Sequence, residues 1–465
     1  MLARPLALAA TLVAGVQCVP HEDARTPEPA STKAKPRLVV LVVIDQLPSW
    51  TFDAQHQALD GGIARLLAHG VYWPHARYPY AATHTAPGHA TIGTGAPPSV
   101  HGIVANRWID PQTGELREVD DDASVTVLDP RGGPGHAHGI SNAKLMVDGL
   151  ADALRAGHGP SAHSIAIGLK GRAAGHVIGR RPELALWFDP GFGALTSSTA
   201  FVAALPEWVT AFAAAHPRDT LLAQTWRADD AERLAKLAGG PDDRPGEGDP
   251  YGLGQTYPHD LARASDPAKA FAFTPMANTL LVDAAIAALE AGHLGSDDVP
   301  DLLAVTFSAH DYAGHVWCQE SWERVDHLLQ IDRDVGRLLD TLDREVGRDR
   351  YAVVLTSDHG STPSLALAPP EARRRLVLAE HVDAVANEAV QRVLGAGKWI
   401  AGTSVLGVTT SPAFDALPGD RRDAAIAAMS AAIADMPGIG LVARADALLG
   451  ECDERSGDDA LACRS

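Results

Sequence analysis

Ionisable residues follow four apolar runs of the chain, close to the point where each run ends. In chain order the pairs are Leu38 to Ile44 with Asp45, Ser164 to Leu169 with Lys170, Leu302 to Phe307 with Asp311, and Tyr351 to Leu355 with Asp358 and His359. Such runs are typical of strands buried on both faces of a parallel sheet. Ligands of these sheets bind outside the carboxyl ends of the strands. We therefore expect these groups to gather at one edge, although any one of them alone would more often be an ordinary structural side chain.

Five of the candidate residues are donors that a metal ion could use. Asp311 and His315 are four residues apart, so on a helical turn they point the same way and can hold one ion. With Asp45, Asp358 and His359 they form an oxygen-and-imidazole set that suits zinc better than calcium. Because five donors exceed what one catalytic zinc takes from protein, we expect two zinc ions roughly 4 Å apart. The alternative is an Asp–His hydrogen-bond network in a polar core.

A candidate nucleophile lies in the segment THTAPGHATIGTG. Thr85 precedes Ala-Pro-Gly and a predicted helix, whose first backbone N–H groups favour an anion. A metal ion at its oxygen would lower the pKa of the hydroxyl and let it attack at neutral to alkaline pH. Thr83 and Thr91 are competing hydroxyls, and Thr85 as a simple helix cap is the structural alternative.

The elements between these residues predict the fold class. Ser321 to Val346 carries apolar residues at three-and-four spacing, which predicts an amphipathic helix that crosses over between two parallel strands. We expect an α/β fold with a mostly parallel central sheet and helices on both faces. Gly239 to Asp260 is dense in Gly, Asp and Pro and predicts a surface loop within an inserted cap segment. Further helices are expected near Arg373 to Val393 and Arg421 to Ala434.

Composition supports a large globular domain and limits its partners. The chain has 465 residues, of which 46% are hydrophobic and 21% charged, so it can build a sizeable core. Its 39 Lys and Arg against 58 Asp and Glu give a net charge of −19. This charge has the wrong sign for a general polyanion binder, so we expect no nucleic-acid duplex as a partner. Any phosphate recognition must be local, through a metal ion or a few placed cations.

The N-terminus predicts export. The stretch MLARPLALAATLVAGVQC has one Arg before a short apolar run, which indicates a signal peptide over residues 1–18. A polar linker over 19–36 and one domain over 37–465 would follow, in a secreted, periplasmic or cell-surface bacterial protein. Cys18 is the position for a lipid anchor, a weaker alternative because Gln17 precedes it. No later run has 18 consecutive apolar residues, so we expect no transmembrane segment.

Five ordered motifs resemble the alkaline phosphatase superfamily. They are VVLVVIDQ, THTAPGHATIGTGAPPSVHGIVANRW, LKGR, PDLLAVTFSAHDYAGH and LTSDHG, and they span about 320 of the 465 residues. The chain looks most similar to the exported, zinc-dependent bacterial alkaline phosphatases related to the type I phosphodiesterases and nucleotide pyrophosphatases.

The resemblance implies a role for each candidate residue. Asp45, Thr85, Asp358 and His359 would form one zinc site, with Thr85 as the nucleophile that becomes phosphorylated. Asp311 and His315 would be two of the three protein ligands of the other. Asn106, Lys170 and Arg172 would hold the phosphate oxygens, and a Lys and an Arg there favour a monoester dianion over a diester. Solvated cations after a strand are the alternative for Lys170 and Arg172.

The sequence departs from the family pattern near its C-terminal end. The family's third ligand of the second zinc is a His in a GTxHG-type motif, and no such motif follows His359; His381 is the only later histidine and has a helix-like context. We therefore expect an incomplete C-terminus, an uncovered sheet edge and weaker zinc at Asp311 and His315. Three functions remain open: a phosphomonoesterase, a phosphodiesterase or nucleotide pyrophosphatase of the same fold, and an inactive phosphate-binding homologue.

Overall fold

The structure of this chain is a computed structural model that describes residues 35–110, 113, 115–404 and 407–448. The signal peptide expected at 1–18, the lipid-anchor position Cys18 and all but the last two residues of the linker expected at 19–36 lie outside the described residues. These expectations stay predictions.

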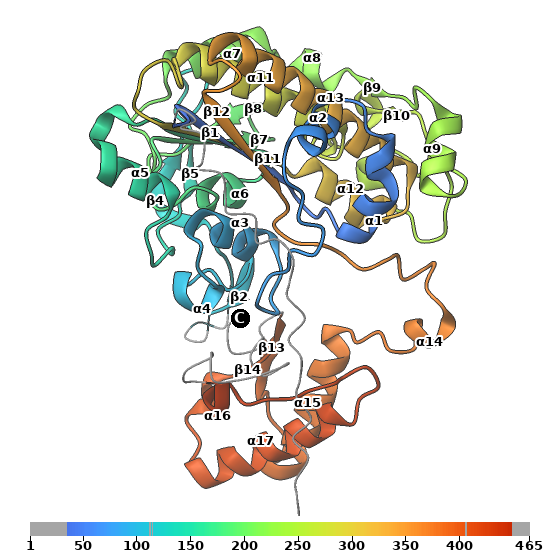
Figure 1. Ribbon diagram of the computed structural model, residues 1–465. Coiled ribbons are helices and arrows are strands. Elements are labelled where there is room, and N and C mark those ends of the chain that lie inside the picture. Colours follow the sequence, from blue (N-terminus) through green and yellow to red (C-terminus); the bar gives the residue numbers. More distant parts are fainter. Residues whose placement is uncertain (1–34, 111–112, 114, 405–406, 449–465) are drawn as a thin grey trace, which may run out of the picture. The chain divides into compact units, whose positions relative to one another are not determined.

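A six-stranded sheet forms the centre of the described chain (Figure 1). Its strand order is β12-β1-β11-β6-β7-β8, and all neighbouring pairs are parallel except β7 and β8. The strands are β1 (Leu38–Ile44), β6 (Ser164–Gly168), β7 (Leu184–Asp189), β8 (Ala194–Thr196), β11 (Asp301–Phe307) and β12 (Tyr351–Thr356). The expected mostly parallel sheet is confirmed, with an antiparallel strand at one edge.

Strand register brings the candidate residues to one edge of this sheet. Ile44 of β1 pairs with Phe307 of β11, and Val43 pairs with Thr356 of β12. Three neighbouring strands therefore end at nearly the same level. Asp45, Asp311 and Asp358 follow these ends within a few residues, as the sequence predicts.

Helices cover both faces of the sheet. This is visible in β1, whose alternate side chains enter two different apolar clusters. Val40 and Val42 belong to the larger cluster and Leu41 and Val43 to the smaller one. The larger cluster includes residues of α2 (Gly62–His69), α7 (Glu207–Ala215), α11 (Pro275–Ala291) and α13 (Trp322–Glu345). The smaller one includes residues of α5 (Leu150–His158) and α6 (Gly171–His176), with Ile92 of α3 (Thr85–Thr94) packed against it.

The expected crossover helix is α13, and it carries a buried structural carboxylate. Asp332 accepts hydrogen bonds from the backbone N–H groups of Asp60, Gly61, Ile63 and Ala64 at 2.9, 2.6, 2.7 and 3.2 Å. These bonds supply acceptors at the start of α2, where helical N–H groups have no partner within the helix. Asp332 thus joins α2 to α13.

Shorter elements fill the insertions between the main strands. In chain order they are α1 (Ser49–Gln55), η1 (His56–Ala58), α4 (Pro98–His101), β2 (Arg107–Ile109), β3 (Leu116–Glu118), β4 (Asp121–Val127), β5 (His136–Ile140), η2 (Gly159–Ser161), α8 (Arg218–Leu222), β9 (Thr225–Trp226), α9 (Ala231–Ala238), η3 (Pro250–Gly252), β10 (His259–Asp260), η4 (Leu261–Arg263), α10 (Pro267–Phe271) and α12 (Ala309–Trp317). The expectation that Gly239 to Asp260 is a surface loop is wrong in part. Glu247, Leu253 and His259 are buried, because this segment packs against the end of α12 through Gly248 N–H to Val316 O at 2.8 Å.

The residues after β12 form a separate apolar cluster. Their elements are α14 (Pro370–Arg373), α15 (Ala379–Leu394), β13 (Ile400–Ser404), β14 (Gly407–Thr410), α16 (Pro412–Asp415), α17 (Gly419–Ala434) and η5 (Ala445–Leu448). Val382, Val390 and Phe414 lie in their shared core. Both expected helices are present. The helix expected from Arg373 begins later, as α15 at Ala379, and the short helix α14 precedes it. His381 is exposed on α15.

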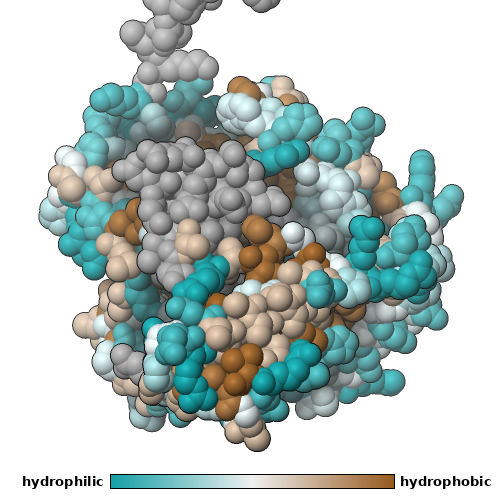
Figure 2. All heavy atoms as spheres, turned by 90° about the horizontal axis from the view of Figure 1, so that it is seen from below, coloured by the Kyte–Doolittle hydropathy of each residue, from teal (hydrophilic) through white to brown (hydrophobic). Residues whose placement is uncertain are grey.

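The described surface is mixed in character. Figure 2 shows hydrophobic residues in separate groups between hydrophilic ones on the face seen from below. Strand β12 forms one edge of the sheet, and its Val354 is 51% exposed. Among the described helices, none is both long and apolar enough to cross a membrane.

Candidate active site

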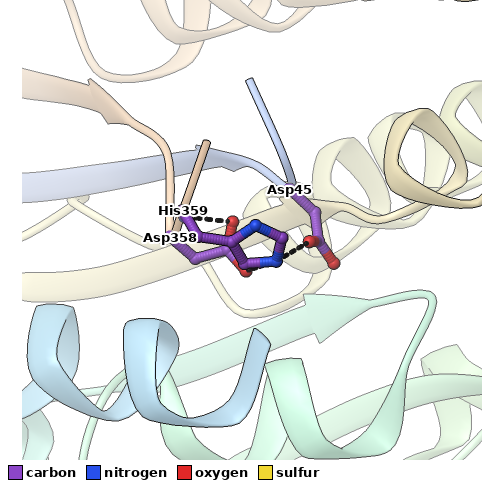
Figure 3. A group of neighbouring side chains, drawn as sticks. All are labelled: Asp45, Asp358 and His359. Carbon is purple, nitrogen blue, oxygen red and sulfur yellow. Dashed lines mark hydrogen bonds and ion pairs between the residues drawn. The ribbon is translucent and has the colours of Figure 1, made fainter. Parts of the chain in front are cut away.

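Asp45, Asp358 and His359 form a compact buried group at the sheet edge (Figure 3). One donor atom from each lies within 4.8 Å of the other two. The Nε2 atom of His359 is 3.4 Å from Asp45 Oδ1 and 3.6 Å from Asp358 Oδ2. Two strand ends, those of β1 and β12, supply this group, as the sequence predicts.

Backbone and imidazole groups fix the Asp358 carboxylate. Its Oδ1 atom accepts hydrogen bonds from the N–H groups of Gln46, at 3.1 Å, and His359, at 2.8 Å. Its Oδ2 atom is 3.1 Å from His89 Nδ1. The side chain is therefore held from three directions before any ligand binds.

Asp311 and His315 form a second pair on α12. They are one helical turn apart, with His315 Nε2 3.1 Å from Asp311 Oδ1. Asp311 is buried, whereas the His315 side chain is largely exposed. The pair does not belong to the compact group of three, so the five expected donors occur as three and two.

Lys170 joins the two sets of carboxylates. Its Nζ atom is 2.9 Å from Asp45 Oδ2, and it also donates to Asp311 Oδ2. The ammonium lies over the Tyr312 ring, 4.6 Å from the centroid. Because Lys170 follows β6 by two residues and is the N-cap of α6, a third strand end contributes to the site.

The pKa values of the three carboxyl groups are shifted in different directions. Burial raises the pKa of Asp45 to about 6, with repulsion from Asp311 and Asp358 adding to the effect. Burial acts in the same direction on Asp311 and Asp358, but Lys170 and His315 hold the pKa of Asp311 well below its usual range. His359 and His89 likewise hold the pKa of Asp358 below its usual range. Asp311 and Asp358 therefore stay ionised at neutral pH.

The pKa values of Lys170 and His359 are raised, which favours their charged forms. Burial alone would lower the pKa of Lys170, but Asp311 and Asp45 raise it above its ordinary value. Burial also acts to lower the pKa of His359, and Asp358 and Asp45 reverse that effect and raise it. The site is thus a network of buried charges of both signs.

Thr85 is the first residue of α3 and is 3% exposed. The N-cap of this helix is His84, with no side-chain cap bond, so the interpretation of Thr85 as a helix cap is wrong. The first turn of α3 packs directly against Asp358: a Cβ atom on Gly88 would lie 2.2 Å from the Asp358 carbonyl oxygen. Only glycine permits this approach, which brings the start of α3 to the carboxylate group.

His84 and His89, the two histidines near Thr85, differ in burial. His89 is a buried, hydrogen-bonded histidine, with Nδ1 2.8 Å from the Thr85 carbonyl oxygen and 3.1 Å from Asp358 Oδ2. His84 is only partly buried. Burial lowers its pKa, and the nearby His359 and His315 lower it further.

Asn106 and Arg172 approach the same region from other elements. Asn106 Oδ1 accepts a hydrogen bond from the Ala86 N–H group at 2.8 Å, which leaves its amino group to serve as a donor. Arg172 lies in α6, two residues after Lys170, and its Nε atom is buried without a hydrogen-bond partner in the described chain. Burial acts to lower the pKa of Arg172, but Tyr312 and Asp120 raise it.

The carboxylates fit a metal ion. Within the described part of the chain, Asp45 Oδ1, Asp311 Oδ1 and Asp358 Oδ2 are buried and accept no well-aligned hydrogen bond, and the only basic group within 3.4 Å of each is a histidine ring nitrogen. An unpaired buried carboxylate oxygen is costly unless a cation compensates it. Carboxylate and imidazole donors at this spacing are ligands that zinc accepts. The group of three is therefore a candidate metal site, and the pair offers two further donors nearby.

Sequence reasoning missed a polar chain beside these residues. Gln46, Gln319 and Arg324 are buried and hydrogen-bonded to one another and to the backbone around Asp45 and Asp311. Gln319 and Arg324 lie outside the five motifs. The one available signal was Gln46, which directly follows Asp45 and ends the motif VVLVVIDQ.

Comparisons with known proteins agree with this geometry. A family model described as type I phosphodiesterase / nucleotide pyrophosphatase matches residues 39–369. Alkaline phosphatase PhoV of Synechococcus elongatus is 32% identical over 338 residues, which cover 71% of this chain and 60% of that protein. Alkaline phosphatase PafA of Elizabethkingia meningoseptica is 30% identical over 345 residues, covering 71% of this chain and 61% of that protein. The chain thus matches about three fifths of the length of these curated relatives.

Solved structures show the same fold. The crystal structure of wild-type PafA aligns with a TM-score of 0.82 at 27% identity, covering 92% of this chain and 82% of that chain. A PafA variant in which a threonine is replaced by serine, and an asparagine, a lysine and an arginine by alanine, aligns with a TM-score of 0.81 at 26% identity.

Proposed function

Because the chain belongs to the type I phosphodiesterase/nucleotide pyrophosphatase family, we propose that it hydrolyses phosphate monoesters through a phosphothreonine formed on Thr85. The observation that carries the proposal is the convergence of three buried carboxylates, Lys170 and the first turn of α3 on one edge of the sheet.

Two zinc ions are the proposed cofactors. Asp45, Asp358, His359 and Thr85 would hold one, and Asp311 and His315 would contribute to the other. Bound there, divalent ions would supply positive charge that lowers the pKa of the Thr85 hydroxyl and stabilises the departing oxygen. One oxygen of each carboxylate accepts no well-aligned hydrogen bond in the described chain and lies beside a histidine, which supports this assignment.

Thr85 would carry out a two-step displacement. Its oxygen forms a bond to phosphorus as the bond from phosphorus to the alcohol breaks, and the alcohol leaves with a proton. Water then attacks the phosphothreonine, releasing inorganic phosphate and restoring the hydroxyl. The start of α3 favours this chemistry, because backbone N–H groups at a helix N-terminus stabilise an anion.

Lys170, Arg172 and Asn106 would recognise the phosphate. Lys170 balances the charges of Asp45 and Asp311, and it becomes available to phosphate oxygens when those carboxylates bind cations instead. The unpartnered Nε of Arg172 and the amino group of Asn106 add further donors. The four residue types changed in the PafA variant occur here, in the same chain order, as Thr85, Asn106, Lys170 and Arg172.

The charge of the transferred group favours a monoester. A monoester dianion has more charge to neutralise than a diester, and two cationic side chains suit it. Phosphodiesterase or nucleotide pyrophosphatase activity is the alternative, and the family description supports keeping it. An inactive phosphate-binding homologue is the third candidate.

Hydrolysis of matched substrates tests this proposal. We expect the zinc-loaded protein to hydrolyse an aryl phosphate monoester faster than the corresponding diester. Lys170→Ala combined with Arg172→Ala should reduce monoester turnover by about 100-fold or more and diester turnover much less. Lys269→Ala, at a surface ion pair with Asp266, is the control. A diester preference in the unmodified protein would support the alternative, and no turnover with well below two zinc ions per chain would support the inactive homologue.

Export is a further part of the proposed function. The signal peptide at residues 1–18 would deliver the enzyme to the periplasm or the cell exterior. N-terminal sequencing of the protein recovered from a bacterial host tests this, since a mature chain that still begins at Met1 would contradict it.

A further inference from the structure

Tyr312 lies beside the buried ammonium of Lys170. It follows Asp311 on α12, and the Lys170 Nζ atom lies over its ring, 4.6 Å from the centroid. The Lys170 side chain is 2% exposed, so the contact is shielded from water. An ammonium at this distance is attracted by the negative face of an aromatic ring, and the attraction is strongest where water is excluded.

The ring is one of three partners of this ammonium. Lys170 Nζ donates to Asp45 Oδ2 at 2.9 Å and to Asp311 Oδ2. An ammonium has three N–H groups, so the two carboxylates use two of them and one remains. Within the described residues no further acceptor contacts this nitrogen, and the Tyr312 ring is the neighbour left to it.

The three partners would respond differently to a bound metal ion. Asp45 and Asp311 are candidate metal ligands, so cations bound to them would compete with the Lys170 ammonium for the same negative charge. Zinc is bound in proteins by thiolate, imidazole and carboxylate groups, and the face of a tyrosine ring is not among them. The ring contact is therefore the one partner of Lys170 that metal binding would leave in place.

Phe273 fixes the plane of the Tyr312 ring. The two rings are stacked, with their centroids 4.9 Å apart and their planes at 28°. Phe273 in turn contacts two buried residues: His327 Nε2 is 3.1 Å from its carbonyl oxygen, and the Trp317 ring lies edge-on at 6.5 Å. Residues of the core therefore hold the ring beside Lys170, and its position does not depend on a ligand.

Tyr312 is also near the second cationic residue assigned to the phosphate. Burial acts to lower the pKa of Arg172, and Tyr312 is the neighbour that does most to raise it. Lys170 is the N-cap of α6, and Arg172 lies in the first turn of this helix. One aromatic ring thus lies close to both cationic side chains.

We propose that Tyr312 is a positioning residue, whose ring holds the Lys170 ammonium at the sheet edge when cations take up the charge of Asp45 and Asp311, so that the ammonium stays where it can bind phosphate oxygens. The part that concerns phosphate rests on the proposed function, whereas the ring contact does not. The alternative is that Tyr312 only fills space against Phe273.

NMR of lysine side chains tests the ring contact without any measurement of activity. Full-length protein with ¹³C-labelled lysine would be compared before and after zinc is added, with the Lys170 signals assigned through Lys170→Arg. Protons that lie over an aromatic ring resonate upfield of their ordinary positions. We expect upfield Lys170 Hε signals both without and with zinc, their loss in Tyr312→Leu and their retention in Tyr312→Phe.

A double-mutant cycle tests the consequence for phosphate. Tyr312→Leu should lower kcat/KM for an aryl phosphate monoester by about 5- to 30-fold and weaken inhibition by inorganic phosphate to the same extent. Tyr312→Phe keeps the ring and should restore most of this loss. When Lys170→Ala is already present, Tyr312→Leu should have little further effect, because the contact is already gone. Tyr251→Leu, which removes another ring that contacts Phe273, is the matched control.

The outcomes separate this proposal from the proposed function. Lys170 signals at ordinary positions in the unmodified protein, or upfield signals that disappear when zinc binds, overturn it. So does a Tyr312→Leu loss that is as large with Lys170→Ala as without it, the result expected of a residue that only fills space. Upfield signals in a protein that hydrolyses no phosphate ester would support the ring contact and refute the proposed function. If Tyr312→Leu does not fold, the signals of the unmodified protein with and without zinc still decide.

Discussion

Two groups of buried acids in this chain differ in how their pKa values are shifted. The pKa of Asp45 at the sheet edge is raised to about 6, in the same direction as in the second group, but the pKa values of its two neighbours are shifted the other way. At the sheet edge, Asp311 and Asp358 lie against Lys170 and histidines, which hold the pKa of each carboxyl well below its usual range despite burial. In the cap segment, burial raises the pKa of Glu247 to about 8, and repulsion from Glu323 and Asp242 raises it further. Burial also raises the pKa of Glu323, and His259, at 3.0 Å, opposes that shift only in part.

The difference separates a binding site from a structural cluster. Acids whose pKa is lowered stay charged in the folded chain at neutral pH and can attract a cation. Acids whose pKa is raised hold a proton in the folded chain, and the stability that they contribute is lost as pH rises. Changes at the sheet edge should therefore reduce activity more than stability, and changes in the cap cluster should affect stability more than activity.

Thr85→Ala should have the largest effect on activity. It removes the nucleophile, so turnover of an aryl monoester should fall by about 1000-fold or more, while the melting temperature changes little. Steady-state kinetics and thermal melting of the same preparation measure the two quantities. Thr91→Ala in the same helix, whose hydroxyl contacts His101, and Thr83→Ala are the controls and should retain most activity. If a control variant loses activity and Thr85→Ala does not, the nucleophile is misassigned.

Asp358→Asn should remove zinc without unfolding the chain. The Asn oxygen still accepts from Gln46 and His359, but the charge that attracts the ion is lost. We expect at least about 100-fold weaker binding of one zinc, measured by chelator competition. The metal-free variant should stay folded but melt at a lower temperature at neutral pH, because the lowered pKa of Asp358 means that its charge stabilises the folded chain.

Asp332→Asn is the matched comparison for this substitution. Asp332 is also buried, but all four of its hydrogen-bond donors are backbone N–H groups at the start of α2. Its loss of charge should lower the free energy of unfolding by about 1–3 kcal/mol and leave zinc binding intact. Equal zinc loss in both variants would show that the sheet-edge group is no special metal site.

Glu247→Gln should produce the smallest change, and one that depends on pH. The folded-state pKa of about 8 lies above the ordinary value of 4.5, so the contribution of this group is fully present below pH 4.5 and is lost as pH rises toward 8. A glutamine has no proton to lose. The variant should therefore match the parent near about pH 5 and melt about 2 °C higher or more near about pH 9.

Activity provides the other half of this comparison. Glu247→Gln should hydrolyse monoesters at the parental rate, and Glu232→Gln, which is exposed on α9, should show neither effect. A gain in melting temperature that is the same at both pH values would mean that Glu247 is ionised in the folded chain.

The sequence predicts the framework of the site because strand pattern and position are local properties. The four apolar runs form neighbouring strands, and the ionisable residues after them reach one edge, because the ends of parallel strands coincide there. The one-turn spacing of Asp311 and His315 likewise follows from helix geometry.

The remaining features depend on contacts between distant segments. The chain from Arg324 to Gln46 joins residues 278 positions apart, and the place of Lys170 between Asp45 and Asp311 depends on the strand order. The cap segment was expected at the surface because its Gly, Pro and Asp content is typical of loops. Glu247 and His259 are nevertheless buried, because α12 and α13 provide the surface against which they pack.

The phosphorylated residue itself gives the most direct test of the proposed mechanism. Zinc-loaded protein would be mixed with an aryl phosphate monoester, quenched in acid during turnover, digested and analysed by mass spectrometry. A phosphate on Thr85, which is absent when zinc is removed, is the predicted result. Steady hydrolysis with no covalent phosphate in the rapidly quenched samples, or with the phosphate on another side chain, would contradict the account.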